Sequence, residues 1–312
     1  GVLAMMKWLR ERYPAEHAVC VFDAKGPTFR DEWYAEYKAQ RAPMPEALAQ
    51  QIEPIHEAVR LLGWPVLEVP GIEADDAIGT LAAMAAASGH KVLISTGDKD
   101  LAQLVDQHVM LVNTMSGERL DVDGVLAKFG VRPGQIVDFL TLVGDSVDNV
   151  PGVEKVGPKT AAKWLAEYGT LEAIVANAGE IGGKVGENLR AALDWLPTAR
   201  TLVTVRTDGE LAARLPQFDT LAVRPPDRAQ LRQLFERWEF RSFLKDLEGS
   251  APQEAAAQTA AEPPQEVERA APPRPQYETV VTAQQLEQWI ARINAAPLVA
   301  LDTETTDLDA MQ

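Results

Sequence analysis

Eight acidic residues occupy positions from which they could share one site. Asp23, Asp98 and Asp100 come directly after short apolar runs that we expect to be strands. Because the carboxyl ends of parallel strands meet at one edge of a sheet, these side chains should lie close together. The remaining acids fall at an expected helix start and in a turn. The whole set comprises Asp23, Glu73, Asp75, Asp76, Asp98, Asp100, Asp145 and Asp148.

The chemistry that such a set supports is the binding of divalent cations. Carboxylates gathered on one edge repel one another unless cations lie among them. Ligands that are all oxygen suit Mg²⁺ or Mn²⁺ rather than zinc, and a pair of such ions promotes in-line hydrolysis of phosphodiesters. Taken singly, each acidic group has an ordinary explanation, because acids complement a helix N-terminus and Asp is common in turns. The four histidines show no metal-ligand spacing, and we interpret them as surface or core residues.

Basic and aromatic residues follow the first of these acids. If residues 30–41 formed a helix, one stripe along it would carry Arg30, Tyr34, Tyr37, Lys38 and Arg41. A stripe that mixes cations with tyrosines can neutralise phosphates and stack against the bases of a single strand. The alternative is a solvated helix face that has no ligand.

A glycine-rich hairpin is expected at residues 150–161. Gly152 and Gly157 would allow the backbone to approach a ligand closely, and Pro158 suits a first helical turn. The free N–H groups of the following helix, together with Lys159, would then face an anion such as a phosphate. The alternative is a tight turn between packed helices.

The elements that must position these residues fall into two regions. Residues 18–22, 91–95 and 109–113 are short β-rich runs, and helical patterns lie between them at 45–62 and 74–87. This alternation indicates an α/β fold with a mostly parallel sheet. From about Gly124 to Leu247 the strand signal fades, and a helical region is predicted.

Composition narrows the class of protein. The chain has 312 residues, 46% of them apolar and 24% charged, which excludes a disordered chain, a collagen and a coiled coil. No apolar run is long enough to span a membrane, no signal peptide is visible, and the single Cys20 favours a reducing compartment. The formal charge of −16 argues against nucleic acid as a partner, although charge over a whole chain says little about one surface.

The C-terminal part has a different composition. Residues 250–276 are dominated by Ala, Pro, Gln and Glu, with no aromatic residue, so we predict a disordered linker. Residues 277–312 end just after an apolar strand candidate at 298–301. Because the chain also begins without Met, we expect it to be an internal piece of a longer protein.

Four motifs give the chain a family resemblance. They are Phe-Asp-Ala-Lys-Gly-Pro-Thr-Phe-Arg at 22–30, Glu-Ala-Asp-Asp at 73–76, Ser-Thr-Gly-Asp-Lys-Asp at 95–100, and Gly-Asp-Ser-Val-Asp-Asn-Val-Pro-Gly at 144–152. In order, they resemble the motifs of the flap endonuclease family, as found in the 5′→3′ exonuclease domains of bacterial DNA polymerases. The resemblance implies a PIN-like α/β domain with a helical arch at 1–123 and a helix-hairpin-helix region that grips duplex DNA at 124–249.

The resemblance also implies roles for single residues. The eight acids would bind two Mg²⁺ or Mn²⁺ ions; the resemblance favours the first four for one ion and the last four for the other and leaves the assignment of each acid open. The residues that match the family's catalytic positions are Asp23, Lys38, Asp75 and Asp98. The residues that match its DNA-binding positions are Lys25, Arg30, Tyr34, Tyr37, Lys38, Arg41, Gly152, Gly157, Lys159 and Thr160. Backbone carbonyls of the hairpin would hold a K⁺ ion.

The implied substrates are DNA molecules with 5′ flaps, nicks or RNA primers. They would be hydrolysed during primer removal and DNA repair by a monomeric protein of the bacterial cytoplasm, associated with the nucleoid. In the family, the first strand carries a further metal-ligating Asp, and this chain begins beyond it. We therefore expect the chain itself to bind metal and DNA weakly and to cleave poorly.

The last residues resemble the truncated start of a 3′→5′ exonuclease domain at 277–312. Asp302 and Glu304, alternate residues on one expected strand, would be metal ligands of an incomplete second site. Two alternatives to a DNA nuclease remain at this stage. One is a module that binds DNA junctions without cleaving them, and the other is an RNA-directed nuclease of the wider PIN-like group.

Overall fold

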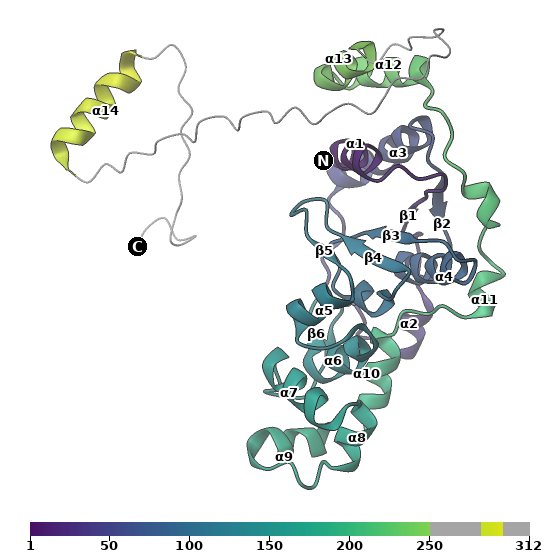
Figure 1. Ribbon diagram of the computed structural model, residues 1–312, viewed down its shortest axis with the longest axis vertical. Coiled ribbons are helices and arrows are strands. Elements are labelled where there is room, and N and C mark those ends of the chain that lie inside the picture. Colours follow the sequence, from purple (N-terminus) through teal and green to yellow (C-terminus); the bar gives the residue numbers. More distant parts are fainter. Residues whose placement is uncertain (250–281, 296–312) are drawn as a thin grey trace, which may run out of the picture. The chain divides into compact units, whose positions relative to one another are not determined.

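The computed structural model describes residues 1–249 and 282–295 (Figure 1). The chain divides into two units, Gly1–Pro252 and Gln253–Gln312. The described part of the second unit is one helix, α14 (Ala283–Ala295). The predicted linker at 250–276, the strand candidate at 298–301, and Asp302 and Glu304 lie outside the described residues.

The first unit begins with an α/β region that carries the longer strands. Its elements are α1 (Val2–Arg12), β1 (Cys20–Phe22), α2 (Phe29–Trp33), α3 (Glu46–Leu61), β2 (Val66–Glu68), α4 (Ala74–Ala87), β3 (Val92–Ser95), the 3₁₀ helix η1 (Asp100–Leu104), β4 (Val109–Val112) and β5 (Arg119–Leu120). The predicted strands near 18–22, 91–95 and 109–113 and the predicted helices near 45–62 and 74–87 are therefore confirmed.

Hydrogen-bonded strands form two small sheets in this region. β1 is parallel to β2, with Cys20 opposite Val66, and β3 is parallel to β4, with Val92 opposite Val109. The third strand of the second sheet, β5, is antiparallel to β4. The sequence did not predict β2 and β5, because two or three residues are too few to show a period. Helix α4 contacts both β1 and β3, so its N-terminus lies near the carboxyl ends of strands from both sheets.

The rest of the first unit is helical, as predicted. Its elements are α5 (Val122–Phe129), η2 (Pro133–Gln135), α6 (Ile136–Val143), β6 (Gly144–Asp145), β7 (Val150–Pro151), α7 (Pro158–Tyr168), α8 (Leu171–Ala176), α9 (Gly183–Ala192), α10 (Leu196–Val203), α11 (Gly209–Ala212), η3 (Phe218–Leu221), α12 (Arg228–Arg237) and α13 (Arg241–Gly249). Figure 1 shows α6 to α10 gathered below the strands.

One hydrophobic core joins the two regions. It includes Leu101 and Leu111 beside the second sheet, and Leu140 and Leu202 from α6 and α10. Each of these four side chains is almost fully buried. The core therefore runs across position 123, where the sequence suggested a boundary, and it fixes α6 and α10 against the strands that carry the acids.

The segment after α2 differs from the prediction. Helix α2 ends at Trp33, so residues 30–41 do not form the single helical stripe that the spacing suggested. Lys38 has a φ of 53°, in the left-handed region, and its N–H donates to the carbonyl of Asp148 at 3.0 Å. Contacts with residues more than a hundred positions away therefore decide the path of this segment, and helical periodicity does not reveal such contacts.

None of the described helices is both long enough and apolar enough to cross a membrane.

Candidate functional site

The first group of acids lies where β1 ends and α4 begins. Asp23 follows β1, and its Oδ1 accepts from the N–H of Ala74 at 2.8 Å. Glu73 is the N-cap of α4 and forms a capping box with Asp76. Burial, followed by the charges of Asp98, Glu73 and Asp23, raises the pKa of Asp75 to about 7. The carboxylates are therefore close enough to repel one another.

The second group surrounds the turn after β3 and the turn after β6. Asp98 accepts from the N–H of Asp100 at 2.9 Å, and Asp145 accepts from the N–H of Val147 at 2.8 Å. Burial, followed by the charges of Asp145 and Asp98, raises the pKa of Asp100 to about 8. Because Asp98 raises the pKa of both Asp75 and Asp100, it links the two groups electrostatically.

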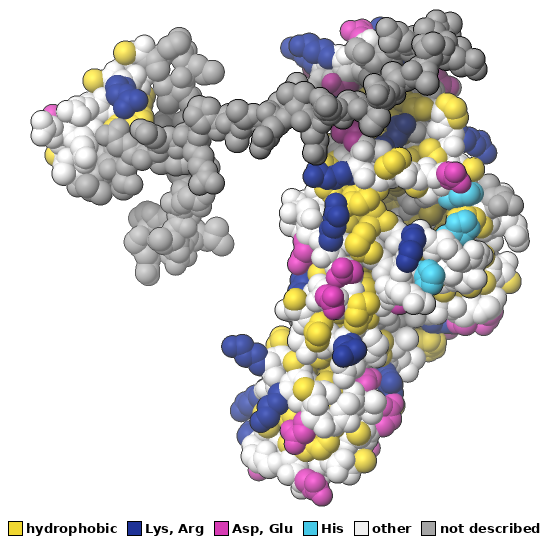
Figure 2. Space-filling model, viewed as in Figure 1, with side chains coloured by type: hydrophobic (Ala, Val, Ile, Leu, Met, Phe, Trp, Pro, Cys, Tyr) yellow, Lys and Arg dark blue, Asp and Glu magenta, His cyan; other side chains and the backbone are white. Residues whose placement is uncertain are grey.

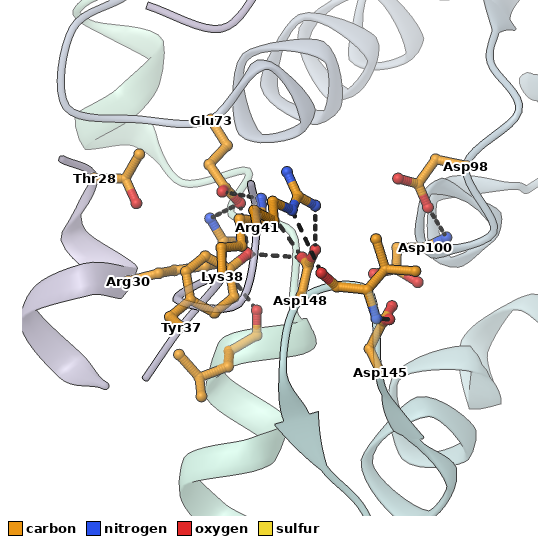
Figure 3. A network of polar contacts seen from close by, with 12 residues as sticks. Thr28, Arg30, Tyr37, Lys38, Arg41, Glu73, Asp98, Asp100, Asp145 and Asp148 are labelled. Carbon is orange, nitrogen blue, oxygen red and sulfur yellow. Dashed lines mark hydrogen bonds and ion pairs between the residues drawn. The ribbon is translucent and has the colours of Figure 1, made fainter. Parts of the chain in front are cut away.

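Basic side chains of the protein lie among these acids (Figure 3). Lys38 pairs with Glu73 and lies 3.6 Å from Asp148, whose other oxygen is 2.6 Å from Nη2 of Arg41. Lys99, which the sequence analysis did not single out, lies 3.2 Å from Asp145. Its position between Asp98 and Asp100 was the signal that could have identified it.

These basic residues change how the acidic cluster must be described. Within residues 1–249 and 282–295, no three acidic, histidine or cysteine side chains come together as a ready coordination group. Lys38, Arg41, Lys99 and Arg30 supply counter-charge among these acids, so the protein's own cations neutralise part of their negative charge. The donors still fit a hard cation, because they are all carboxylate oxygens and because burial, and then neighbouring carboxylates, raise the pKa of Asp75 and Asp100.

Tyr37 connects the two acidic groups. Its side chain is 4% exposed, and its hydroxyl lies 2.9 Å from Oε2 of Glu73 and 2.8 Å from Oδ2 of Asp148. Burial and the charges of these two acids raise the pKa of the phenol. Tyr37 was expected to contact DNA, but the structure places its hydroxyl in the carboxylate network instead. The ring of Tyr34 packs against that of Trp195 at a centroid distance of 5.0 Å. Lys25, two residues after Asp23, is exposed to solvent.

Arg30 and Asp76 also lie where the sequence did not place them. Arg30, expected among the DNA contacts, is 2% exposed, and Asp76, expected among the metal ligands, is 0% exposed. The guanidinium of Arg30 donates to both oxygens of Asp76, at 2.6 and 2.9 Å. In this structure, Arg30 therefore faces the interior and not the surface along which a strand could pass.

The hairpin at 150–161 has the expected form. Helix α7 begins at Pro158 with Gly157 as its N-cap, and the N–H groups of Thr160 and Ala161 both bond to the carbonyl of Gly157. A Cβ on Gly157 would meet no atom within 4 Å, so this glycine faces open space. A Cβ on Gly152 would lie 2.3 Å from the carbonyl carbon of Val143, so Gly152 is required by close packing within the protein.

A row of lysines continues from this hairpin. Lys155, Lys159 and Lys163 are spaced four residues apart and are all exposed. Among the described residues, no acidic group pairs with any of the three within 4.0 Å. Figure 2 shows Lys and Arg side chains along the edge of the helical region near α7. The sequence analysis named only Lys159, although the four-residue spacing within α7 could have revealed Lys163. Lys155 precedes the helix and has a positive φ of 66°, so helical spacing does not identify it.

Comparisons with known proteins agree with this architecture. Residues 1–130 match the family described as 5′-3′ exonuclease, N-terminal resolvase-like domain, and residues 131–229 match 5′-3′ exonuclease, C-terminal SAM fold. The chain is 42% identical to the 5′-3′ exonuclease of Aquifex aeolicus over 248 residues, covering 80% of this chain and 84% of that protein.

A longer protein matches the whole chain. DNA polymerase I of Pseudomonas aeruginosa is 46% identical over 324 residues, and the match covers 100% of this chain and 34% of that polymerase. The chain thus spans about a third of that relative's length. Among solved structures, the T5 5′-exonuclease with bound divalent metal ions (zinc) has a similar fold, with a TM-score of 0.58 and 24% identity, over 66% of this chain and 80% of that one.

Proposed function

Because this chain belongs to the 5′-3′ exonuclease family, we propose that it is the 5′ nuclease part of a bacterial DNA polymerase I and acts on DNA in primer removal and repair. The observation that carries the proposal is the meeting of two acidic groups, from β1–α4 and from the turns after β3 and β6, beside the cations Lys38 and Arg41. Hard oxygen donors beside phosphate-binding cations suit the hydrolysis of a phosphodiester.

Two divalent cations, Mg²⁺ or Mn²⁺, would be held by the acids of both groups. When bound, they supply charge stabilisation at the phosphate and an activated water. The residues that fit this role are Asp23, Glu73, Asp75, Asp98, Asp100, Asp145 and Asp148. Asp76 is not included, because it is 0% exposed and both of its carboxylate oxygens accept hydrogen bonds from Arg30.

The basic residues of the site orient the substrate. Lys38 and Arg41 contact Glu73 and Asp148, and they would turn to the phosphate that is cleaved once cations neutralise those acids. Lys99 lies 3.2 Å from Asp145 and would contact the same strand. The chain's own cations thus hold the strand across the carboxylates that bind the metal.

The helical region would hold the duplex. Lys155, Lys159 and Lys163, together with the open N-terminus of α7 at Gly157, present positive charge to a DNA backbone. Contacts of this kind are independent of base sequence.

We further propose that the carbonyls of the hairpin bind a K⁺ ion and that the substrates are DNA molecules with 5′ flaps, nicks or RNA primers. We also propose that the protein is monomeric and lies in the bacterial cytoplasm at the nucleoid.

Cleavage of labelled oligonucleotides tests the proposal. The purified chain is incubated with 5′-flap DNA, nicked DNA and single-stranded RNA, each with Mg²⁺ or with EDTA. We expect slow Mg²⁺-dependent release of short 5′ products from flap DNA by the chain and faster release by an N-terminally extended form, both abolished by Asp98→Ala. Binding of flap DNA without any cleavage by the chain or by an N-terminally extended form would indicate a junction-binding module. Faster cleavage of RNA than of flap DNA would indicate an RNA-directed nuclease.

A further inference from the structure

Arg30 and Asp76 form an ion pair that is fully enclosed by the protein. Nη1 of Arg30 donates to Oδ2 of Asp76 at 2.6 Å, and Nη2 donates to Oδ1 at 2.9 Å. The two residues are 2% and 0% exposed. Two parallel hydrogen bonds between a guanidinium and a carboxylate give the pair a fixed geometry.

The remaining polar atoms of the pair are also occupied by the protein. Nε of Arg30 donates to the carbonyl of Leu202 at 2.9 Å, and Nη2 donates to that of Thr204 at 2.8 Å. Asp76 accepts from the N–H of Arg206 at 2.9 Å and from that of Glu73 at 3.4 Å. Four donors of the chain thus surround the two oxygens of Asp76.

Arg30 also reaches Glu73, one of the proposed metal ligands. Nη1 lies 3.1 Å from Oε2 of Glu73, the oxygen that also accepts from Tyr37. Arg30 therefore contacts a residue at the first turn of α4 while it bonds to carbonyls at the end of α10. It joins the acidic site to the helical region through a single side chain.

We infer that Asp76 and Arg30 act as a positioning pair: Asp76 binds no metal but holds Arg30, which fixes Glu73 and joins α4 to the end of α10. The inference rests on the proposed function only in taking Glu73 as a metal ligand. It separates two neighbouring acids that the sequence alone treats alike, assigning Asp75 to the metal and Asp76 to the guanidinium. Breaking one member of such a pair leaves the other charge buried without its partner.

Mn²⁺ binding by matched variants tests the assignment, with free Mn²⁺ measured by electron paramagnetic resonance in the absence of DNA. Asp76→Asn frees Arg30 from its fixed position beside Glu73, so we expect Mn²⁺ binding to weaken on the order of tenfold, as for other residues that support metal ligands. Adding Arg30→Met should weaken Mn²⁺ binding no further, because Asp76 acts on Glu73 only through Arg30. The matched control is Asp75→Asn, to whose loss of binding the loss caused by Arg30→Met should add.

Thermal unfolding provides a second readout that does not depend on metal. Arg30→Met leaves the carboxylate of Asp76 buried and unpaired, so it should lower the melting temperature more than the double variant does. If Arg30→Met alone does not fold, Asp76→Asn and the double variant still carry the metal measurement. Conservative Arg30→Lys, which cannot bind both oxygens in parallel, should restore only part of the melting temperature.

Each outcome decides for or against the pair. A double variant that binds Mn²⁺ clearly more weakly than Asp76→Asn would show that the two residues act independently and would overturn the inference. Melting temperatures whose decreases simply add would also overturn it. If neither the unaltered chain nor an N-terminally extended form binds Mn²⁺ or cleaves flap DNA, the proposed function fails, whereas the melting temperatures still report on the pair.

Discussion

The hydroxyl of Tyr37 lies 2.8 Å from a carboxylate oxygen of Asp148, although the two residues are 111 positions apart in the chain. The same hydroxyl lies 2.9 Å from Glu73. A phenol has one proton to donate, so it can donate to only one of the two acids at a time. Tyr37 thus joins the start of α4 to the turn after β6, and it does so between the two acidic groups.

We predict that Tyr37→Phe lowers the cleavage rate while leaving the fold intact. The buried ring is kept, but Glu73 and Asp148 lose the hydroxyl that holds them, and residues that support metal ligands typically affect activity by about 10–100-fold. Single-turnover cleavage of flap DNA measures the rate, and circular dichroism verifies the fold. Tyr13→Phe is the matched control, because the described structure offers the buried Tyr13 hydroxyl no hydrogen-bond partner. Equal rates for the two variants would contradict a positioning role for Tyr37.

Two glycines of the hairpin should respond differently to alanine. A Cβ on Gly152 would lie 2.3 Å from the backbone of Val143, whereas one on Gly157 would meet nothing within 4 Å. We expect Gly152→Ala to lower the free energy of unfolding by about 1–3 kcal/mol, the usual cost of overpacking, and Gly157→Ala to change it little. Urea unfolding compares the two. A Gly152→Ala variant as stable as the unaltered chain would show that β6 and β7 can separate without cost.

The lysine row should govern the salt dependence of DNA binding. Substituting Gln for Lys155, Lys159 or Lys163 should weaken binding to duplex DNA of any sequence. Each substitution should lower the slope of log affinity against log salt by about 0.9 if the lysine contacts one phosphate. Fluorescence anisotropy at several NaCl concentrations measures the slope. Lys128→Gln is the control, because Lys128 pairs with Glu118 at 2.6 Å. An unchanged slope in all three variants would remove this row from the DNA interface.

Asp138 should make stability depend on pH. Burial raises the pKa of this carboxyl, despite the N–H of Leu171 and the guanidinium of Arg200, which act in the opposite direction. The folded state therefore binds the proton more tightly than the unfolded state. The stability that this proton contributes is present below the ordinary carboxyl pKa and is lost as pH rises through the raised folded value.

Asp138→Asn should reveal this dependence. The Asn side chain does not titrate and can still accept from the N–H of Leu171, which now bonds to Asp138 at 2.9 Å. The free energy of unfolding of the variant, relative to that of the unaltered chain, should therefore increase from about pH 4 to neutrality, by about 1.4 kcal/mol per unit of pKa shift. Urea unfolding at a series of pH values, with exposed Asp123→Asn as control, measures it. A difference that does not change with pH would contradict the raised pKa.

Much of the fold follows from local sequence signals. The alanine-rich pattern at 74–87 predicted α4, and Gly157-Pro158 predicted the start of α7, because caps and apolar periodicity act within a few residues. The path after α2 could not be predicted in this way. Arg30 and Lys38 find their partners at Asp76, Glu73 and Asp148, and such distant pairs leave no periodic signal.

The candidate site was predicted as a set of residue types rather than as a geometry. The motifs identified the acids around Asp75 and Asp100, and the pKa values of both are raised by burial and then by neighbouring carboxylates. They could not separate Asp76 from Asp75, because burial depends on what packs over the first turn of α4. Lys99 lies inside the motif at 95–100 but was not predicted as a site residue, because its contact with Asp145 depends on a turn far along the chain.

The hydrophobic core that includes Leu111 and Leu140 also limits which parts of this protein could be exchanged with those of a relative. A cut between the strand-bearing and helical regions would expose apolar surface on both pieces and separate Arg30 from the carbonyls of Leu202 and Thr204. Replacing only the strand-bearing region or only the helical region with its counterpart from a relative should therefore disrupt the fold, unless the core residues that both regions share are replaced as well.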